Sequence, residues 1–188
     1  MEFVGQLWLP ILLSAVFVFI MSSIVWTLLP HHKNEFQPAP NTDGIQAALK
    51  GAAPGTYMFP MHADPKQRRS KEAMQKYAEG PSGLLTLMAP GPMNMGKMMA
   101  QSLVLNLVVS FFTAYVAGHV LAMGGPTAPN YLTVFRVVGT IGFMAYGFGP
   151  LFESVWFGKP WGSQALNLFD SLLYGLLTAG TFGWLWPR

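Results

Sequence analysis

Four long apolar stretches dominate the pattern of hydrophobic and polar positions along the chain. They cover residues 7–29, 98–122, 132–156 and 166–186. An α-helix needs about 20 mostly apolar residues to cross a hydrocarbon layer about 30 Å thick. Each stretch meets that length, and four of them in 188 residues leave too little polar surface for a soluble protein. The pattern therefore predicts an all-α integral membrane protein with four transmembrane helices.

The polar segment between the first two stretches, residues 30–97, carries signals of folded structure. Helix start signals at Asn41 and at Asp64-Pro65 predict short helices that end near residues 50 and 79. The short apolar runs 56–59 and 84–88 are typical of strands. We therefore expect three parts: a first transmembrane helix within 1–29, a small α+β insert outside the membrane at 30–97, and three further transmembrane helices within 98–188.

Positive charge indicates how these helices are oriented. The insert holds eight of the eleven Lys and Arg residues, whereas the loop 123–131 holds none. Lys and Arg near membrane helices are retained on the cytoplasmic side. The insert is therefore predicted to be cytoplasmic, with both chain termini in the periplasm.

Small residues repeat at a spacing of four along two of the apolar stretches. Such ridges allow close helix packing in lipid, where no hydrophobic driving force acts between helices. We expect the second and fourth helices to approach each other along their ridges, within one chain or between copies, while glycines thin the third helix. The predicted packing residues are Ser110, Ala114, Gly118 and Ala122 on the second helix, Gly139 and Gly142 on the third, and Ser171, Gly175, Ala179 and Gly183 on the fourth.

Arg136 lies about one turn inside the third apolar stretch. Seventeen helical residues, about 25 Å, separate it from Glu153 near the opposite face, so the two cannot pair within one bundle. Its expected partners are Glu2, the terminal carboxylate, a lipid phosphate or another subunit.

Asp170, His31 and His32 are predicted to lie near the cytoplasmic face. Asp170 stands in the first turn of the fourth stretch, where a helix N-terminus favours an acid and where the side chains of Lys159 and Lys97 are within reach. His31 and His32 directly follow the first stretch. We interpret all three residues as contacts to a partner or to lipid.

Metal binding is the alternative interpretation of the histidines. Imidazole is a good metal ligand, but two neighbouring residues rarely complete a coordination shell, and the chain contains no Cys. This alternative predicts an ion near His31, His32 and His62. A methionine cluster, Met88, Met93, Met95, Met98 and Met99, offers a second and weaker metal hypothesis, a copper(I) site.

The remaining chemistry argues against catalysis. The chain has no phosphate-binding Gly-rich loop and no readable Ser-His-Asp arrangement. No ionisable residue falls at the predicted membrane midplane, where coupled transporters place theirs. The net charge of +3 fits anionic headgroups better than nucleic acid. We expect no enzyme, no catalytic residue, no cofactor and no metal, and partners limited to lipid and membrane subunits.

Three segments resemble an uncharacterised family of small bacterial multi-pass membrane proteins. They are Trp26-Thr-Leu-Leu-Pro-His-His-Lys, Gly55-Thr-Tyr-Met-Phe-Pro and Leu176-Leu-Thr-Ala-Gly-Thr-Phe-Gly-Trp-Leu-Trp-Pro. The family has no established activity, so the resemblance implies only a bacterial inner membrane as location.

The sequence thus favours a structural or accessory protein of a larger membrane assembly, held by other subunits or by self-association. A small oligomeric transporter or pore is the first alternative, with a path lined by Ser102, Asn106, Ser110 and Thr178. A membrane-embedded metal-dependent protein is the second.

Overall fold

The computed structural model describes residues 2–62 and 64–188 and divides into two compact units. The first unit comprises residues 1–36, 94–155 and 159–188 and holds the four long helices apart from the last residues of the third. The second unit comprises residues 37–93 and the short segment 156–158. The long helices are α1 (Glu2–Thr27), α4 (Met95–Val120), α5 (Tyr131–Phe157) and α6 (Trp161–Leu185). A single 3₁₀ turn, η1 (Pro30–His32), follows α1.

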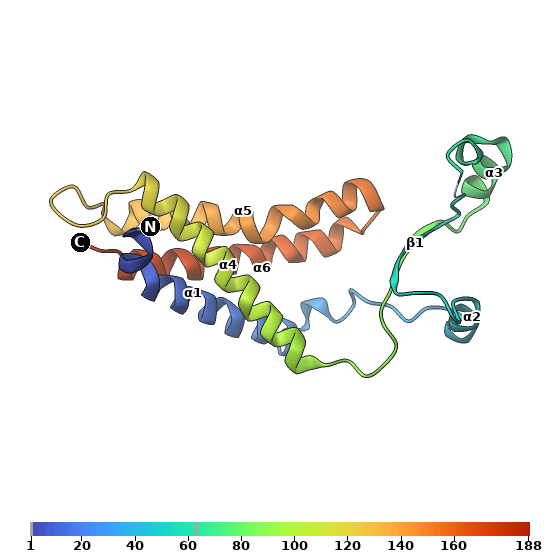
Figure 1. The fold of residues 1–188 in the computed structure, drawn as a ribbon, viewed down its shortest axis with the longest axis horizontal. Helices are drawn as coiled ribbons and strands as arrows, with labels where there is room; N and C mark the ends of the chain where they lie inside the picture. Colours follow the sequence, from blue (N-terminus) through green and yellow to red (C-terminus); the bar gives the residue numbers. More distant parts are fainter. Residues whose placement is uncertain (1, 63) are drawn as a thin grey trace. The chain divides into compact units, whose positions relative to one another are not determined.

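The four long helices form one antiparallel bundle (Figure 1). One buried cluster joins the start of α1, the end of α4, the start of α5 and the end of α6, represented by Leu7, Ala117, Val134 and Phe182. At the same end, the Trp186 indole N–H donates to the carbonyl oxygen of Ala122 at 3.0 Å. Successive long helices therefore run in opposite directions.

Three of the described helices, α1, α4 and α5, are long and apolar enough to cross a membrane. Large apolar side chains such as Leu105, Phe112 and Phe152 are about 60% exposed on the bundle surface (63%, 59% and 65%). Hydrocarbon is a natural solvent for such a surface, which is consistent with a membrane protein. The fourth expected helix is present as α6, but it is not among these three, because residues such as Asn167 and Asp170 lower its apolar content.

Glycine allows a close approach of α5 and α6. A methyl group built on Gly175 of α6 would lie 2.9 Å from the backbone nitrogen of Phe143 and 3.2 Å from the carbonyl oxygen of Gly139, both on α5. A methyl group on Gly142 would lie 3.3 Å from the Cα of Gly175. Backbone meets backbone there, so α5 and α6 depend on the missing side chains for their packing.

The α4 ridge packs against α1. A methyl group on Gly118 would lie 3.1 Å from the Cβ of Phe3. The hydroxyls of Ser14 and Ser110 are 3.0 Å apart and both side chains are buried. Within the chain, the ridges of α4 and α6 thus make these close contacts with α1 and α5. The reason is that α5 carries its own thinned face, at Gly139 and Gly142, which receives α6. Pairing of ridges between copies stays a prediction.

The second unit contains α2 (Thr42–Ala48), β1 (Gly55–Phe59), η2 (Gln67–Arg69), α3 (Lys71–Glu79) and β2 (Gly83–Leu87). The strands pair antiparallel, with Gly55 opposite Leu87 and Phe59 opposite Gly83. The small two-stranded sheet is therefore present.

One expected helix of the insert differs from the structure. The helix expected over 65–79 is divided at Ser70, which has extended backbone (φ −68°, ψ 158°). Its hydroxyl accepts a hydrogen bond from the Ala73 N–H at 3.1 Å, so it is the N-cap of α3. The helix therefore starts after the N-cap residue Ser70 and not at Pro65.

Candidate functional site

The candidate site is built where the chain leaves α1. Leu29 is extended and Pro30 begins the 3₁₀ turn η1, since its fixed φ suits the first position of a helical turn. This turn presents two consecutive imidazoles, His31 and His32, to the N-terminal half of α6. Asp170 points toward them from α6.

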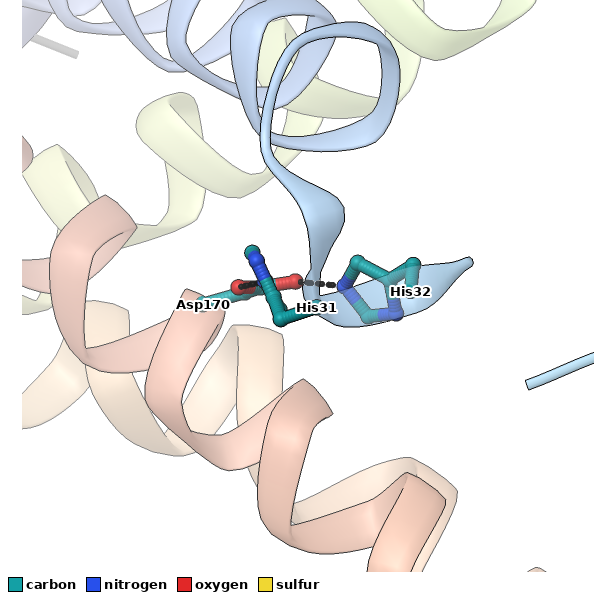
Figure 2. A group of neighbouring side chains, drawn as sticks. All are labelled: His31, His32 and Asp170. Atoms are coloured by element: carbon teal, nitrogen blue, oxygen red, sulfur yellow. Dashed lines mark hydrogen bonds and ion pairs between the residues drawn. The ribbon is translucent and has the colours of Figure 1, made fainter. Parts of the chain in front are cut away.

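His31, His32 and Asp170 form a compact group, which we call the His–Asp cluster (Figure 2). The Nε2 atom of His31 lies 3.0 Å from one carboxylate oxygen of Asp170, and the Nε2 atom of His32 lies 2.7 Å from the other. All three donor atoms lie within 4.8 Å of one another. The side chains of His32 and Asp170 are each only 4% exposed, whereas that of His31 is 21% exposed.

Two further side chains fix the orientation of His32. Its Nδ1 atom lies 2.6 Å from a carboxylate oxygen of Glu35, which is itself buried. The ring of Trp26 stacks on the imidazole with centroids 4.1 Å apart and planes 5° apart. His32 is thereby held between two carboxylates, with its ring plane set by an indole.

This environment changes the acidity of His32. Burial lowers the pKa of His32, but the hydrogen bonds and charges of Asp170 and Glu35 outweigh it, so its pKa is raised above the ordinary value of 6.5. The cluster therefore favours a positive charge at the imidazole.

A cleft of about 260 Å³ borders the cluster. Asp170 and Glu35 contribute to its wall, as do Asn167 and Tyr174. The hydroxyl of Tyr174 is buried and has no hydrogen-bond partner among the described residues. The wall of the cleft thus combines carboxylate, amide and phenol side chains, which suits a small polar molecule or water.

In the structure, Asp170 contacts two histidines and not Lys159. Lys159 pairs with Glu153 instead, with Nζ and Oε2 3.1 Å apart, and this pair is largely exposed. Asp170 is buried and takes the two histidines, because η1 brings their rings to α6 while Lys159 remains near the surface. Both histidines thus contact Asp170 of their own chain, and contacts of the cluster with a partner protein or with lipid stay a prediction.

Other expected site residues lie elsewhere. Arg136 is exposed on α5, and no hydrogen bond or ion pair of its side chain is found within the described residues. Glu2, one of its expected partners, has a side chain outside the described part. His62 belongs to the second unit, where its carbonyl oxygen accepts a hydrogen bond from Arg68.

Sequence reasoning missed Glu35 and the contact of Trp26 with His32. Nothing in a three-residue separation distinguishes Glu35 from any acidic residue in a polar segment. The His–Asp cluster could have been predicted from membrane depth. The end of the first helix and the start of the fourth were both expected at the cytoplasmic face. That shared depth places His31 and His32 within reach of Asp170.

The chain matches no protein-family model, and comparisons with curated proteins and with solved structures gave no match either.

Proposed function

We propose that this chain is a multi-pass protein of the bacterial inner membrane that serves as a structural or accessory component of a larger membrane assembly. In this proposal α6 is a fourth transmembrane helix. Its support is the antiparallel packing against α5, which extends from Gly147 beside Ser171 to Tyr131 beside Gly183. A helix packed along the length of a spanning neighbour has its polar residues sheltered by protein rather than by lipid.

The proposed orientation rests on charge. Eight of the eleven Lys and Arg residues lie in residues 30–97, and this charge supports a cytoplasmic insert with both termini in the periplasm. The bacterial inner membrane rests on the resemblance described for the sequence.

One observation carries the accessory role: within the second unit, the described residues leave strand β1 uncovered. All five residues of β1 are exposed, and Tyr57, Met58 and Phe59 retain 37%, 42% and 45% of their surface. Two-stranded sheets are marginally stable alone and need packing against another surface. An exposed apolar strand is also an edge that other chains can pair with or cover. We assign that cover to another protein subunit.

A site-specific photo-crosslinker tests this assignment in native membranes. Placed at Met58, it is expected to form a covalent adduct with a different polypeptide. Placed at Lys50, an exposed polar position of the same unit, it is the matched control and is expected to give little adduct. Adducts from Met58 that contain only lipid, or only a second copy of this chain, would contradict the accessory role.

The alternative of a small oligomeric pore gains little from the contacts. Asn106, Ser110 and Thr178 are buried inside the bundle, whereas Ser102 is exposed on its surface. Ser110 is hydrogen-bonded to Ser14 at the contact of α1 and α4. These polar groups therefore serve helix contacts at least as well as a water-filled path.

A further inference from the structure

We propose that the His–Asp cluster is a binding site for a divalent transition-metal ion such as Zn²⁺. His31 and His32 supply one imidazole nitrogen each and Asp170 supplies its carboxylate. This inference rests on the contacts of the cluster and is independent of the proposed accessory role.

The charges around the cluster call for a cation. Asp170 and Glu35 are both buried, with 4% and 5% of their side-chain surface exposed, and their two negative charges exceed the single positive charge that a protonated His32 supplies. The nearby ion pair of Lys159 and Glu153 is already neutral and cannot compensate them. Buried charges are stable only when they are paired or bound to a metal. One divalent ion balances the two carboxylates completely.

The arrangement of lone pairs points to the position of that cation. Without a metal ion, His32 donates its Nδ1–H to Glu35, and a proton on Nε2 is shared with Asp170. A metal ion would replace that proton, because the Nε2 nitrogen and the carboxylate oxygen, 2.7 Å apart, then both face one positive centre. The second histidine approaches the other oxygen of the same carboxylate at 3.0 Å. Three donor atoms thus converge on one small volume.

The surroundings of the donors are those of metal sites. A ligating histidine commonly donates its second ring N–H to a carboxylate, which fixes its tautomer and raises its basicity. Glu35 occupies this role toward His32, and Trp26 stacks against the ring. Both orient a ligand without themselves touching the ion.

The spacing of the donors needs little adjustment. Zinc–ligand bonds of about 2.1 Å in tetrahedral geometry separate neighbouring ligand atoms by about 3.4 Å. The His31–Asp170 distance of 3.0 Å must open by about 0.4 Å, which rotation of His31 can supply because its side chain is 21% exposed. The His32–Asp170 distance of 2.7 Å must open by about 0.7 Å, through a small shift of η1 against α6. Three protein donors leave a coordination position free, and the cleft lined by Asp170 gives it access to water.

The donor set also selects the class of ion. Two imidazoles and one carboxylate suit zinc, cobalt, nickel or iron, whereas magnesium and calcium prefer sites made of oxygen ligands. We therefore expect Zn²⁺ and Co²⁺ to bind, and Mg²⁺ in large excess to leave them in place.

The test uses the full chain, purified in detergent without a histidine tag and stripped of metal by a chelator. Titration with Co²⁺ reports coordination directly through its visible d–d absorption, and competition with Zn²⁺ gives the affinity for zinc. We expect one ion per chain at saturation. Asp170→Asn and His31→Gln should each weaken zinc binding by more than tenfold. Glu35→Gln should weaken it by about 10–100-fold, the range found when an orienting partner of a ligating histidine is lost.

Two controls separate the site from other histidines. His119→Gln alters an exposed position on α4, and His62→Gln alters the second unit, so both should bind zinc as the parent chain does. Helical circular dichroism and a single elution peak identify variants that remain folded. If Asp170→Asn fails this check, His31→Gln decides, because its side chain is the most exposed of the three ligands.

Absence of a d–d absorption band in the parent chain would overturn the proposal. The contacts between the two histidines and Asp170 would then be hydrogen bonds only. Binding that survives unchanged in His31→Gln would overturn it as well. A band lost in the ligand variants and kept in both control variants is the result that establishes the site.

Discussion

The α5–α6 contact permits a quantitative test in which Gly175 is replaced by alanine. The new methyl group would lie 2.9 Å from the Phe143 backbone nitrogen and 3.2 Å from the Gly139 carbonyl oxygen. Both neighbours are backbone atoms, so relief requires the helices to separate. Overpacking of this kind costs about 1–3 kcal/mol.

Gly180→Ala is the matched control for this substitution. Gly180 also lies inside α6, but its added methyl group would meet only the Tyr131 hydroxyl, at an ordinary contact distance of 3.9 Å. Each replacement of a helical glycine by alanine gains about 1 kcal/mol of helix propensity. This gain occurs in both variants and cancels, so their difference in unfolding free energy reports overpacking alone.

Thermal unfolding in detergent, followed by circular dichroism at 222 nm, measures that difference. For a chain of this length, 1 kcal/mol shifts Tm by about 2–4 °C. Gly175→Ala should therefore unfold about 2–12 °C below Gly180→Ala. A Tm for Gly175→Ala equal to or above that of Gly180→Ala would refute the close backbone approach of α5 and α6.

Three further predictions concern contacts in the same bundle. A double-mutant cycle of Ser14→Ala and Ser110→Ala should give a coupling free energy of about 0.6 kcal/mol, the typical value for polar pairs between membrane helices, and zero coupling would contradict the α1–α4 contact. Lys159→Ala removes an exposed ion pair with Glu153 and should change the unfolding free energy by less than about 1 kcal/mol, so a larger loss would show that the pair is buried in an assembly. Asp170→Asn, measured without metal, should destabilise the chain by about 3 kcal/mol because it breaks a buried charged contact, and an unchanged Tm would show that the η1–α6 tie is absent.

The long helices were predictable because their signal is local and strong. The stretch 98–122 became α4 (Met95–Val120), and the stretch 132–156 became α5 (Tyr131–Phe157), with ends displaced by one to three residues. Apolar length alone sets these elements in a membrane environment. The strand expected over 56–59 became β1 for a similar reason, since proline and glycine bound it on both sides.

The pairing of side chains was less accessible, because it depends on which helix faces come together. Small residues mark a face that packs closely but do not name its neighbour, so the sequence could not tell that Gly175 meets α5 or that Gly118 meets α1. Asp170 shows the same limit. Its contact with His31 joins residues 139 positions apart, and only the turn at Pro30 decides that an imidazole, rather than a lysine, reaches the carboxylate.

Glu35 could not have been found from sequence at all, because its role follows from the direction of the Nδ1 atom of His32. The unsatisfied hydroxyl of Tyr174 is a comparable case, since burial of that one atom depends on side chains from several elements. When a site is assembled from a turn and a distant helix, the sequence predicts only the types of its residues and their depth in the membrane.

The composition of the native particle tests the accessory role most directly. The protein would be extracted from its own membranes in mild detergent and its particle weighed intact by native mass spectrometry. The proposal predicts a particle that contains this chain together with at least one different polypeptide. A particle made only of copies of this chain would contradict it.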